Sequence, residues 1–196
     1  MGVPGFGKKQ GHERPHPAMT FFSRVCYGVA AAVFLGGAGC GYTTRSALPS
    51  HFKTVAVEPF ANKIDYMSAG TRQIYVPLLE VKVRDAVIDR FLFDGNLRLS
   101  EADTADLVLT GELVRYERSA LRYTDDNDVQ EYRVHVVVSL VMKDRRHDAV
   151  LWREPRFAGT ATYFVAGPLA ATESAALEEA TLDLARRIVE RTVEDW

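Results

Sequence analysis

Residues 129–143 read Val-Gln-Glu-Tyr-Arg-Val-His-Val-Val-Val-Ser-Leu-Val-Met-Lys, and this stretch sets the architecture of the chain. Its even-numbered positions from 132 to 142 are all apolar, the pattern of a β-strand with one buried face. The odd-numbered face begins with Glu131, Arg133 and His135 but continues with Val137 and Val141. A solvent face would be polar throughout. We therefore expect this face to be half covered, either by the loop at 61–74 or by a partner or lipid.

Two more long strands are predicted beside this stretch. Residues 106–122 alternate, with one apolar set on each face: Leu107, Leu109 and Leu113 on the first, and Val108, Thr110, Val114 and Tyr116 on the second. The polar segments 124–128 and 144–148 are predicted turns, because Asp and Asn hydrogen-bond to their own backbone. Residues 149–165 form the third strand, in which Pro155 indicates an edge position or a bulge.

The remaining elements come before and after these strands. Residues 53–60 predict a first strand that closes at Pro59, and 97–99 predict a brief strand or bulge. A helix of about 16 residues is expected after Pro77 and before Gly95, because one apolar residue recurs every four positions. That stripe consists of Leu79, Val83, Val87 and Phe91. A last helix is expected from about 170 to 194, with Thr172 as a candidate cap.

The order of elements is strand, helix, three strands, helix. A right-handed crossover places the first helix on one face of the sheet, and the last helix has a single apolar seam to bury. These features predict an α+β fold, a two-layer sandwich with two helices packed on one face of a four-stranded mixed sheet.

The first 39 residues have the layout of a signal peptide. Basic residues precede an apolar run at 25–35, which is followed by small residues and then Cys40. The run is too short to span a bilayer. We predict a signal peptide at 1–39, a lipidated tether at 40–50 beginning with the acylated Cys40, and one domain at 51–196. The alternative is plain cleavage near this point that leaves Cys40 as a free thiol, and Gly37 stands where bacterial lipoproteins usually carry a branched residue.

Composition argues against nucleic-acid binding. The whole chain has a formal net charge of −2, and the leader carries four basic side chains and one acidic one, so residues 40–196 have a net charge near −5. Affinity for nucleic acid depends on neutralising phosphates. The only cysteines are Cys26 and Cys40, so the mature chain has no thiol besides Cys40. A mature chain with so few thiols suits an oxidising compartment.

Catalytic motifs are missing from the sequence. It has neither a Gly-x-Ser-x-Gly elbow nor a glycine-rich phosphate loop, and its histidines show no metal-ligand spacing. We expect no catalytic residue, no metal site and no cofactor. Three arginines are more informative, because Arg118 and Arg122 end one predicted strand and Arg133 begins the next. Arginine binds phosphate with two parallel hydrogen bonds, so this hairpin tip is a candidate anion site. The alternative is a solvated hairpin whose charges are matched by neighbouring carboxylates.

Several short motifs resemble the LPS-assembly lipoprotein family, LptE. They occur in the same order and spacing, namely Cys40-Gly41-Tyr42, Leu48-Pro49, Lys53-Thr54-Val55-Ala56-Val57-Glu58-Pro59-Phe60-Ala61-Asn62, Ala105-Asp106-Leu107-Val108-Leu109-Thr110-Gly111 with Tyr116, Glu131-Tyr132-Arg133 and Leu151-Trp152. The resemblance implies a non-enzymatic lipoprotein at the periplasmic side of the outer membrane. It also implies two partners, the β-barrel translocon LptD and lipopolysaccharide. The competing hypotheses are a lipid-anchored periplasmic ligand- or lipid-binding protein without a barrel partner and, more weakly, a hydrolase.

Overall fold

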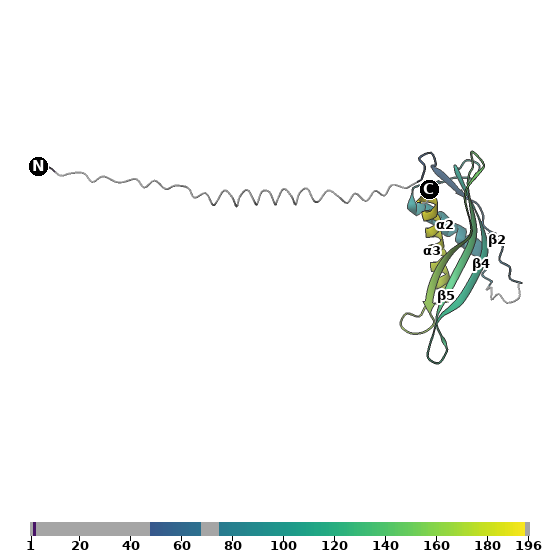
Figure 1. Ribbon diagram of the computed structural model, residues 1–196, viewed down its shortest axis with the longest axis vertical. Coiled ribbons are helices and arrows are strands. Elements are labelled where there is room, and N and C mark those ends of the chain that lie inside the picture. The colour runs from purple at the N-terminus through teal and green to yellow at the C-terminus, as the bar shows by residue number, and fades with distance from the viewer. Residues whose placement is uncertain (1, 3–47, 68–74, 195–196) are drawn as a thin grey trace. The chain divides into compact units, whose positions relative to one another are not determined.

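The computed structural model describes residues 2, 48–67 and 75–194. Its central strand is β5 (Val129–Asp144), which pairs antiparallel with β4 (Leu107–Tyr123) on one side and with β6 (Ala149–Phe164) on the other (Figure 1). The even-numbered face of β5 is buried at Val134, Val136, Val138, Leu140 and Met142. The alternation predicted from the sequence is therefore confirmed, and this face of the sheet forms one side of the hydrophobic core.

The sheet has six strands, so the predicted number of four is wrong. Along the sheet the order is β3-β1-β4-β5-β6, and β2 also pairs with β4. The predicted first strand at 53–60 is shorter in the structure, where it is β1 (Thr54–Val57). A further strand, β2 (Ala61–Asn62), forms where a loop was predicted, and both strands are parallel to β4. Pro59 lies between them and has no N–H to donate to the ladder. The sixth strand is β3 (Arg98–Leu99), which pairs in parallel with the first residues of β1.

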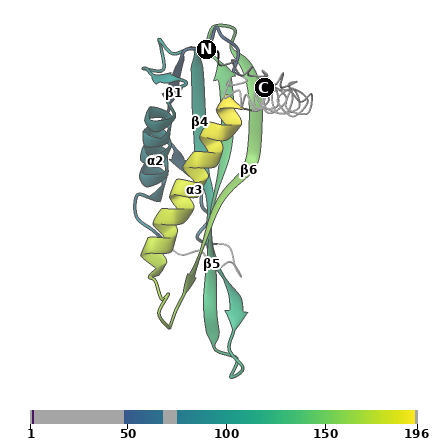
Figure 2. The same ribbon diagram turned by 90° about the vertical axis from the view of Figure 1, so that its left-hand side faces the viewer.

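Both helices cover the same face of the sheet, as the two-layer α+β prediction requires. Figure 2 shows α2 (Leu79–Asp94) and α3 (Glu173–Val193) side by side in front of the strands. The predicted stripe of α2 is buried in the core together with Ala180, Leu184 and Ile188 of α3. The architecture follows because each helix has one apolar side to bury and the sheet offers one apolar face.

The ends of the helices follow local rules. Gly95 adopts a left-handed conformation at φ +73° and its N–H bonds to the carbonyl of Phe91, as predicted for the end of α2. The Thr172 hydroxyl accepts a hydrogen bond from the Ala175 N–H at 3.1 Å and caps α3. Because Thr172 itself is extended, α3 begins at Glu173 rather than at the predicted residue 170.

Two irregularities in the strands redirect side chains. Pro155 lies on the edge strand β6, inside a register shift that separates the pairs Val138–Phe157 and Leu140–Glu154. The sequence indicated an edge position or a bulge for Pro155, and the structure shows both. A second shift after Leu113 turns Tyr116 to the core face, although simple alternation placed it with Thr110 on the other face. An extra residue in one strand reverses the facing of the residues after it.

Candidate functional site

The β4–β5 hairpin reaches beyond the first turn of α3 and carries the candidate arginines near its tip (Figure 2). Its turn closes with hydrogen bonds from the Thr124 N–H to the Asp128 carbonyl at 2.8 Å and from the Asn127 N–H to the Thr124 carbonyl at 3.0 Å. Asn127 has a φ of +67°, a conformation that asparagine tolerates. The predicted turn at 124–128 is confirmed.

Arg118 points to the helix side of the sheet, because it pairs across the ladder with the buried Val134. Its guanidinium forms an ion pair with Glu173, in the first turn of α3. It also stacks over the ring of Tyr132, 4.6 Å from the ring centroid, and lies 3.5 Å from the Tyr163 hydroxyl. Arg118 is therefore held within the fold by one carboxylate and two aromatic rings.

Tyr116 completes this cluster on the same face. Its hydroxyl donates a 2.7 Å hydrogen bond to the second oxygen of Glu173. Burial, and then the neighbouring Glu173 carboxylate, raise the pKa of Tyr116, so the phenol stays protonated and remains a donor. We name Tyr116, Arg118, Tyr132, Tyr163 and Glu173 the Glu173 cluster. It fastens the start of α3 to all three long strands.

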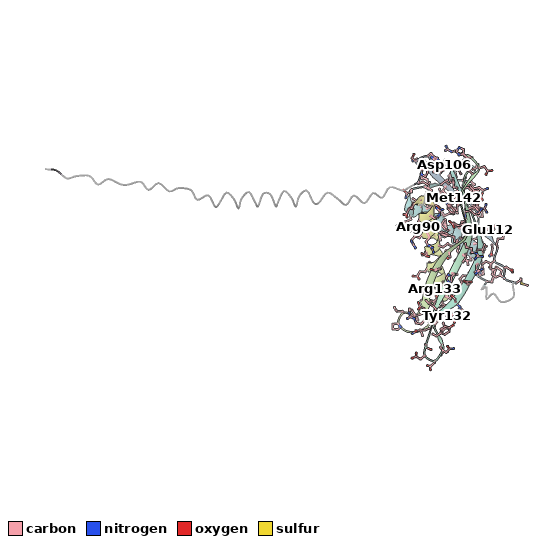
Figure 3. The ribbon with its side chains drawn as sticks, in the orientation of Figure 1. Arg90, Asp106, Glu112, Tyr132, Arg133 and Met142 are labelled. Carbon is pink, nitrogen blue, oxygen red and sulfur yellow. The ribbon has the colours of Figure 1, made fainter. Side chains whose placement is uncertain are left out.

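Arg122 and Arg133 lie on the opposite face from Arg118. Arg122 pairs with Glu131, with 3.6 Å between its Nε and the carboxylate. Arg133 lies between Ser119 and Thr162 in the ladder and, among the residues that the structure describes, has neither a hydrogen-bond nor an ion-pair partner for its guanidinium. Figure 3 shows Arg133 near the hairpin end. The sheet therefore separates the three arginines that the sequence grouped, and of these three it leaves Arg133 without a partner in the described part of the chain.

The outer face of β5 remains partly open. The side chains on this face are all half-buried, namely Arg133, His135, Val137, Ser139 and Val141. The loop at 61–74 was expected to cover this face. Its first residues do not, because Ala61 and Asn62 pair with β4 in the plane of the sheet. Residues 68–74 of that loop lie outside the described part of the chain. A mixed apolar and cationic surface is thus available on the side away from the helices.

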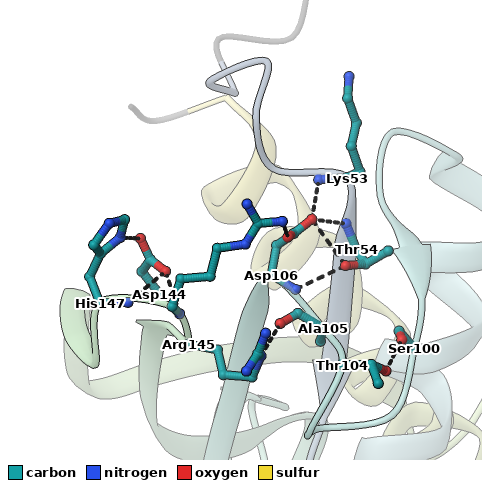
Figure 4. Close-up of polar contacts among 10 residues, drawn as sticks. Lys53, Thr54, Ser100, Thr104, Ala105, Asp106, Asp144, Arg145 and His147 are labelled. Atoms are coloured by element: carbon teal, nitrogen blue, oxygen red, sulfur yellow. Dashed lines mark hydrogen bonds and ion pairs between the residues drawn. The ribbon is translucent and has the colours of Figure 1, made fainter.

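A second polar cluster lies at the end of the sheet where β1 begins (Figure 4). The Asp106 carboxylate accepts hydrogen bonds from the backbone N–H groups of Lys53 at 2.9 Å and Thr54 at 3.1 Å, from the Thr54 hydroxyl at 3.1 Å and from Arg146 at 2.6 Å. Burial opposes ionisation of this carboxyl, but these donors together lower the pKa of Asp106. The cluster fixes the point at which the chain enters the sheet.

Sequence reasoning placed Asp106 at the start of a predicted strand and within a motif of the family resemblance, and assigned it no partner. Its partners Lys53 and Thr54 are more than 50 positions away, so local rules could not identify them. The same is true of Glu173, which follows the predicted cap Thr172 but whose partner Arg118 is 55 positions away. The available signal was the short motif around residues 105–111, which the resemblance had already brought out.

Other kinds of site have less support. Within residues 48–67 and 75–194, no group of three or more His, Cys, Asp or Glu side chains is placed to hold a metal ion. Over the same ranges, no helix combines the length and apolar character needed to cross a membrane. A groove of about 410 Å³ lies between α2 and α3, lined by Ala86, Leu177 and Leu182 and by the acidic Asp85 and Glu178. Cys40 lies outside the described residues.

Comparisons with known proteins agree with this architecture. The model of the family described as LptE, lipopolysaccharide-assembly, matches residues 52–192. No curated protein matches the sequence. Among solved structures, protein XCC0632 from Xanthomonas campestris is 14% identical with a TM-score of 0.52, over 77% of this chain and 92% of that one. At this identity the likeness concerns the fold alone.

Two further solved structures are more distant in shape. The PelC dodecamer from Paraburkholderia phytofirmans is 16% identical with a TM-score of 0.43, covering 77% of this chain and 94% of that one. The rare lipoprotein B from Shewanella oneidensis is 16% identical with a TM-score of 0.39, covering 69% of this chain and 91% of that one.

Proposed function

Because the chain belongs to the LptE lipopolysaccharide-assembly family, we propose that it is a non-enzymatic lipoprotein of the outer membrane that partners the β-barrel LptD in lipopolysaccharide transport and outer-membrane assembly. The observation that carries the proposal is the extent of the match, which runs from Phe52 in the segment before β1 to Thr192 in the last turn of α3. It therefore includes the sheet, both helices and both polar clusters. The family's role supports the absence of an enzymatic activity.

The proposed location is the periplasmic side of the outer membrane, with Cys40 as the acylated first residue of the mature protein. Gly41 supports the outer membrane, because lipoproteins kept at the inner membrane usually carry Asp at that place. Two or more acyl chains anchor a protein stably where one does not. Intact-mass measurement of the membrane-extracted protein should give a chain that starts at Cys40 and carries acyl groups. An unmodified chain starting elsewhere would contradict this part of the proposal.

The hairpin supplies a candidate contact for the phosphates of lipopolysaccharide. The sequence assigns this contact to Arg118, Arg122 and Arg133. The structure distinguishes the three by whether a carboxylate already pairs with each guanidinium. Arg118 already neutralises Glu173, and Arg122 lies beside Glu131, whereas Arg133 has no carboxylate partner among the described residues. An unpaired guanidinium on a half-open face is the best placed to take a phosphate.

Co-purification tests the barrel partnership. The protein would be expressed with a C-terminal tag, extracted from outer membranes in mild detergent and captured, and its companions identified by mass spectrometry. The expected result is a large β-barrel recovered in near-equal amount with the tagged chain. A parallel capture of the Val87→Asp variant, which we expect to be misfolded, controls for nonspecific recovery. A folded, acylated protein that brings no barrel would overturn the proposal.

The groove between α2 and α3 favours one alternative function, the binding of a small ligand without a barrel partner. Its volume of about 410 Å³ lies within the usual size of ligand pockets. It is an open furrow that only residues of the two helices line, so the sheet takes no part in it. Recovery of the protein as a free species with a bound small molecule would support this alternative.

A further inference from the structure

The last turn of α2 exposes two large apolar side chains in succession. Leu92 is 63% exposed and Phe93 is 81% exposed, although Phe91 immediately before them is fully buried. A single exposed leucine is ordinary in a soluble domain, but an adjacent aliphatic and aromatic pair at the end of a helix is a small apolar ridge that needs an explanation. The pair contributes nothing to the core, because it follows the buried stripe and points away from it.

This ridge lies at the end of the domain where the chain enters. Three residues separate α2 from β3, which pairs with Thr54 and Val55, and the Arg98 N–H donates to the Lys53 carbonyl at 3.0 Å. Leu48 packs against the core a few residues earlier. Figure 2 shows α2 and β1 together in the half of the domain opposite the β4–β5 hairpin tip. The Asp106 cluster holds this entry point in place.

The length of the tether limits how far this end can lie from a lipid anchor. Seven residues separate Cys40 from Leu48, and the eight Cα–Cα steps between these two residues span at most about 30 Å when fully extended. The 17 residues of β4 extend about 55 Å away from that end. If Cys40 is acylated, the entry end therefore stays within about 30 Å of the anchored first residue, a limit that does not apply to the hairpin tip.

A cation accompanies the ridge. The Arg90 guanidinium lies over the Phe93 ring, 5.1 Å from the ring centroid. Its Nε is shielded from solvent without an acceptor, and within the described residues no carboxylate pairs with it. Figure 3 places Arg90 on the helix side of the domain. Arginine is weakly hydrated and forms paired hydrogen bonds with phosphate, so an arginine beside an exposed phenylalanine suits the boundary between lipid headgroups and acyl chains.

We propose that the ridge formed by Leu92 and Phe93, with Arg90 beside it, inserts into the headgroup region of the leaflet to which Cys40 is anchored. The partner is a phospholipid bilayer with anionic headgroups. Phe93 and Leu92 bury apolar surface among the lipids, and Arg90 binds a headgroup phosphate. This contact depends on the proposed acylation of Cys40, and it fixes which end of the domain faces the membrane.

Photo-crosslinking in vesicles tests the contact. The full chain would be produced in a Gram-negative host with benzoylphenylalanine at position 93, extracted, and reconstituted into vesicles of phosphatidylethanolamine and phosphatidylglycerol. After irradiation, mass spectrometry should detect phospholipid adducts at position 93. The matched control carries the same photoreactive residue at position 169, where Leu169 is 75% exposed in the segment between β6 and α3. That control should give no phospholipid adduct above background.

A charge variant tests the role of the arginine. Arg90→Gln should lower the adduct yield at position 93 in vesicles that contain phosphatidylglycerol, and should change it much less in vesicles of phosphatidylcholine alone. If the protein with Arg90 and the Arg90→Gln variant give the same adduct yield in both kinds of vesicle, Arg90 does not bind a headgroup phosphate.

The remaining outcomes are distinguishable. Protein adducts at position 93, from a second copy or a barrel, would overturn the lipid contact and assign the ridge to a protein interface. Equal lipid labelling at positions 93 and 169 would also overturn it. Intact mass is measured first on the same sample. Acyl chains at Cys40 without lipid adducts would defeat this inference alone, whereas missing acyl chains would remove its premise and contradict the proposed anchor as well.

Discussion

Gly159 marks the place where the backbone of α3 comes closest to the sheet. A Cβ at this position would lie 2.2 Å from the Ala180 carbonyl oxygen and 2.5 Å from the Leu184 Cβ. Both obstacles belong to the helix body, so neither can rotate away. We expect Gly159→Ala to lower the free energy of unfolding by about 1–3 kcal/mol, the usual cost of overpacking. Urea denaturation of the unlipidated residues 41–196 measures it, with the exposed neighbour Thr160→Ala as control. Equal stability of the two variants would show that α3 shifts freely.

Asp106 should make the stability of the domain depend on acid pH. Burial opposes its charge, but the Lys53 and Thr54 donors and Arg146 lower its pKa below the ordinary 3.8. A carboxyl with a lowered pKa contributes stability that is complete above the unfolded-state value and is lost as pH falls through the folded-state value. We therefore expect the wild type to lose stability below about pH 4, and the Asp106→Asn variant to be less stable at pH 7 with a flatter acid profile.

The measurement for Asp106 is the melting temperature from pH 7 down to pH 2.5 for both proteins. Asp103→Asn, at an exposed position nearby, is the matched control and should follow the wild type. Some acid sensitivity should remain in Asp106→Asn, because a hydrogen bond from His147 and then backbone donors lower the pKa of Asp144 as well. Parallel profiles for wild type and Asp106→Asn would contradict the assigned role.

Local residue rules succeeded where the cause is local. Thr172, Gly95 and Pro155 behave as their own chemistry dictates, at a helix start, a helix end and a bulged edge strand. Gly159 and Asp106 could not be assigned from sequence, since their roles depend on Ala180 and Lys53, which are distant along the chain.

At the scale of elements, the stripe of α2 was the clearest prediction, and Val87 is fully buried at its centre. Val87→Asp places an unpaired charge in the core and should cost about 3–5 kcal/mol, enough to unfold a typical small domain in part or in full. Circular dichroism melts of the unlipidated residues 41–196 would show the loss. The exposed Val81→Asp, on the same helix, should melt close to the wild type. A cooperative Val87→Asp melt within a few degrees of the wild type would mean that the stripe does not support the core.

The long strands show why the face on which a side chain lies was harder to predict than the presence of the strand itself. All three long strands lie within two residues of their expected bounds, because their periodicity is long and regular. The bulge after Leu113 has no signature in the sequence, yet it turns Tyr116 and Arg118 to the helix side. One inserted residue was enough to place a predicted surface cation inside the Glu173 cluster.

For the molecule as a whole, the two-layer architecture was predictable, because apolar stripes and alternation leave few ways to bury the core. For the candidate site, the sequence predicted the hairpin tip but not which of its arginines has no carboxylate partner. The hairpin does bring the arginines near one tip, but a sheet has two faces, and cross-strand partners decide which cations remain free. Arg118 is bound by Glu173, whereas Arg133 has no such partner within the described residues.

This division makes the lipopolysaccharide contact testable with single substitutions. Binding of the unlipidated residues 41–196 to lipopolysaccharide would be measured at two salt concentrations. We expect Arg133→Ala to weaken binding by about 1.5–3 kcal/mol, the worth of a charge-assisted hydrogen-bonded contact. Arg133→Lys should recover only part of that loss, because lysine lacks the planar fork. The difference should shrink at the higher salt concentration, because salt screens exposed charges.

Arg122→Ala and Arg118→Ala act as opposite controls in this experiment. Arg122→Ala should have a smaller effect on binding, since Glu131 already offsets that charge. Arg118→Ala should chiefly lower the melting temperature, because it removes the partner of Glu173 at the start of α3. If Arg133→Ala binds as well as the wild type at low salt, the hairpin tip is a solvated turn. Lipopolysaccharide would then have to meet the half-open outer face around Val137 and Val141, where apolar side chains rather than cations would supply the contact.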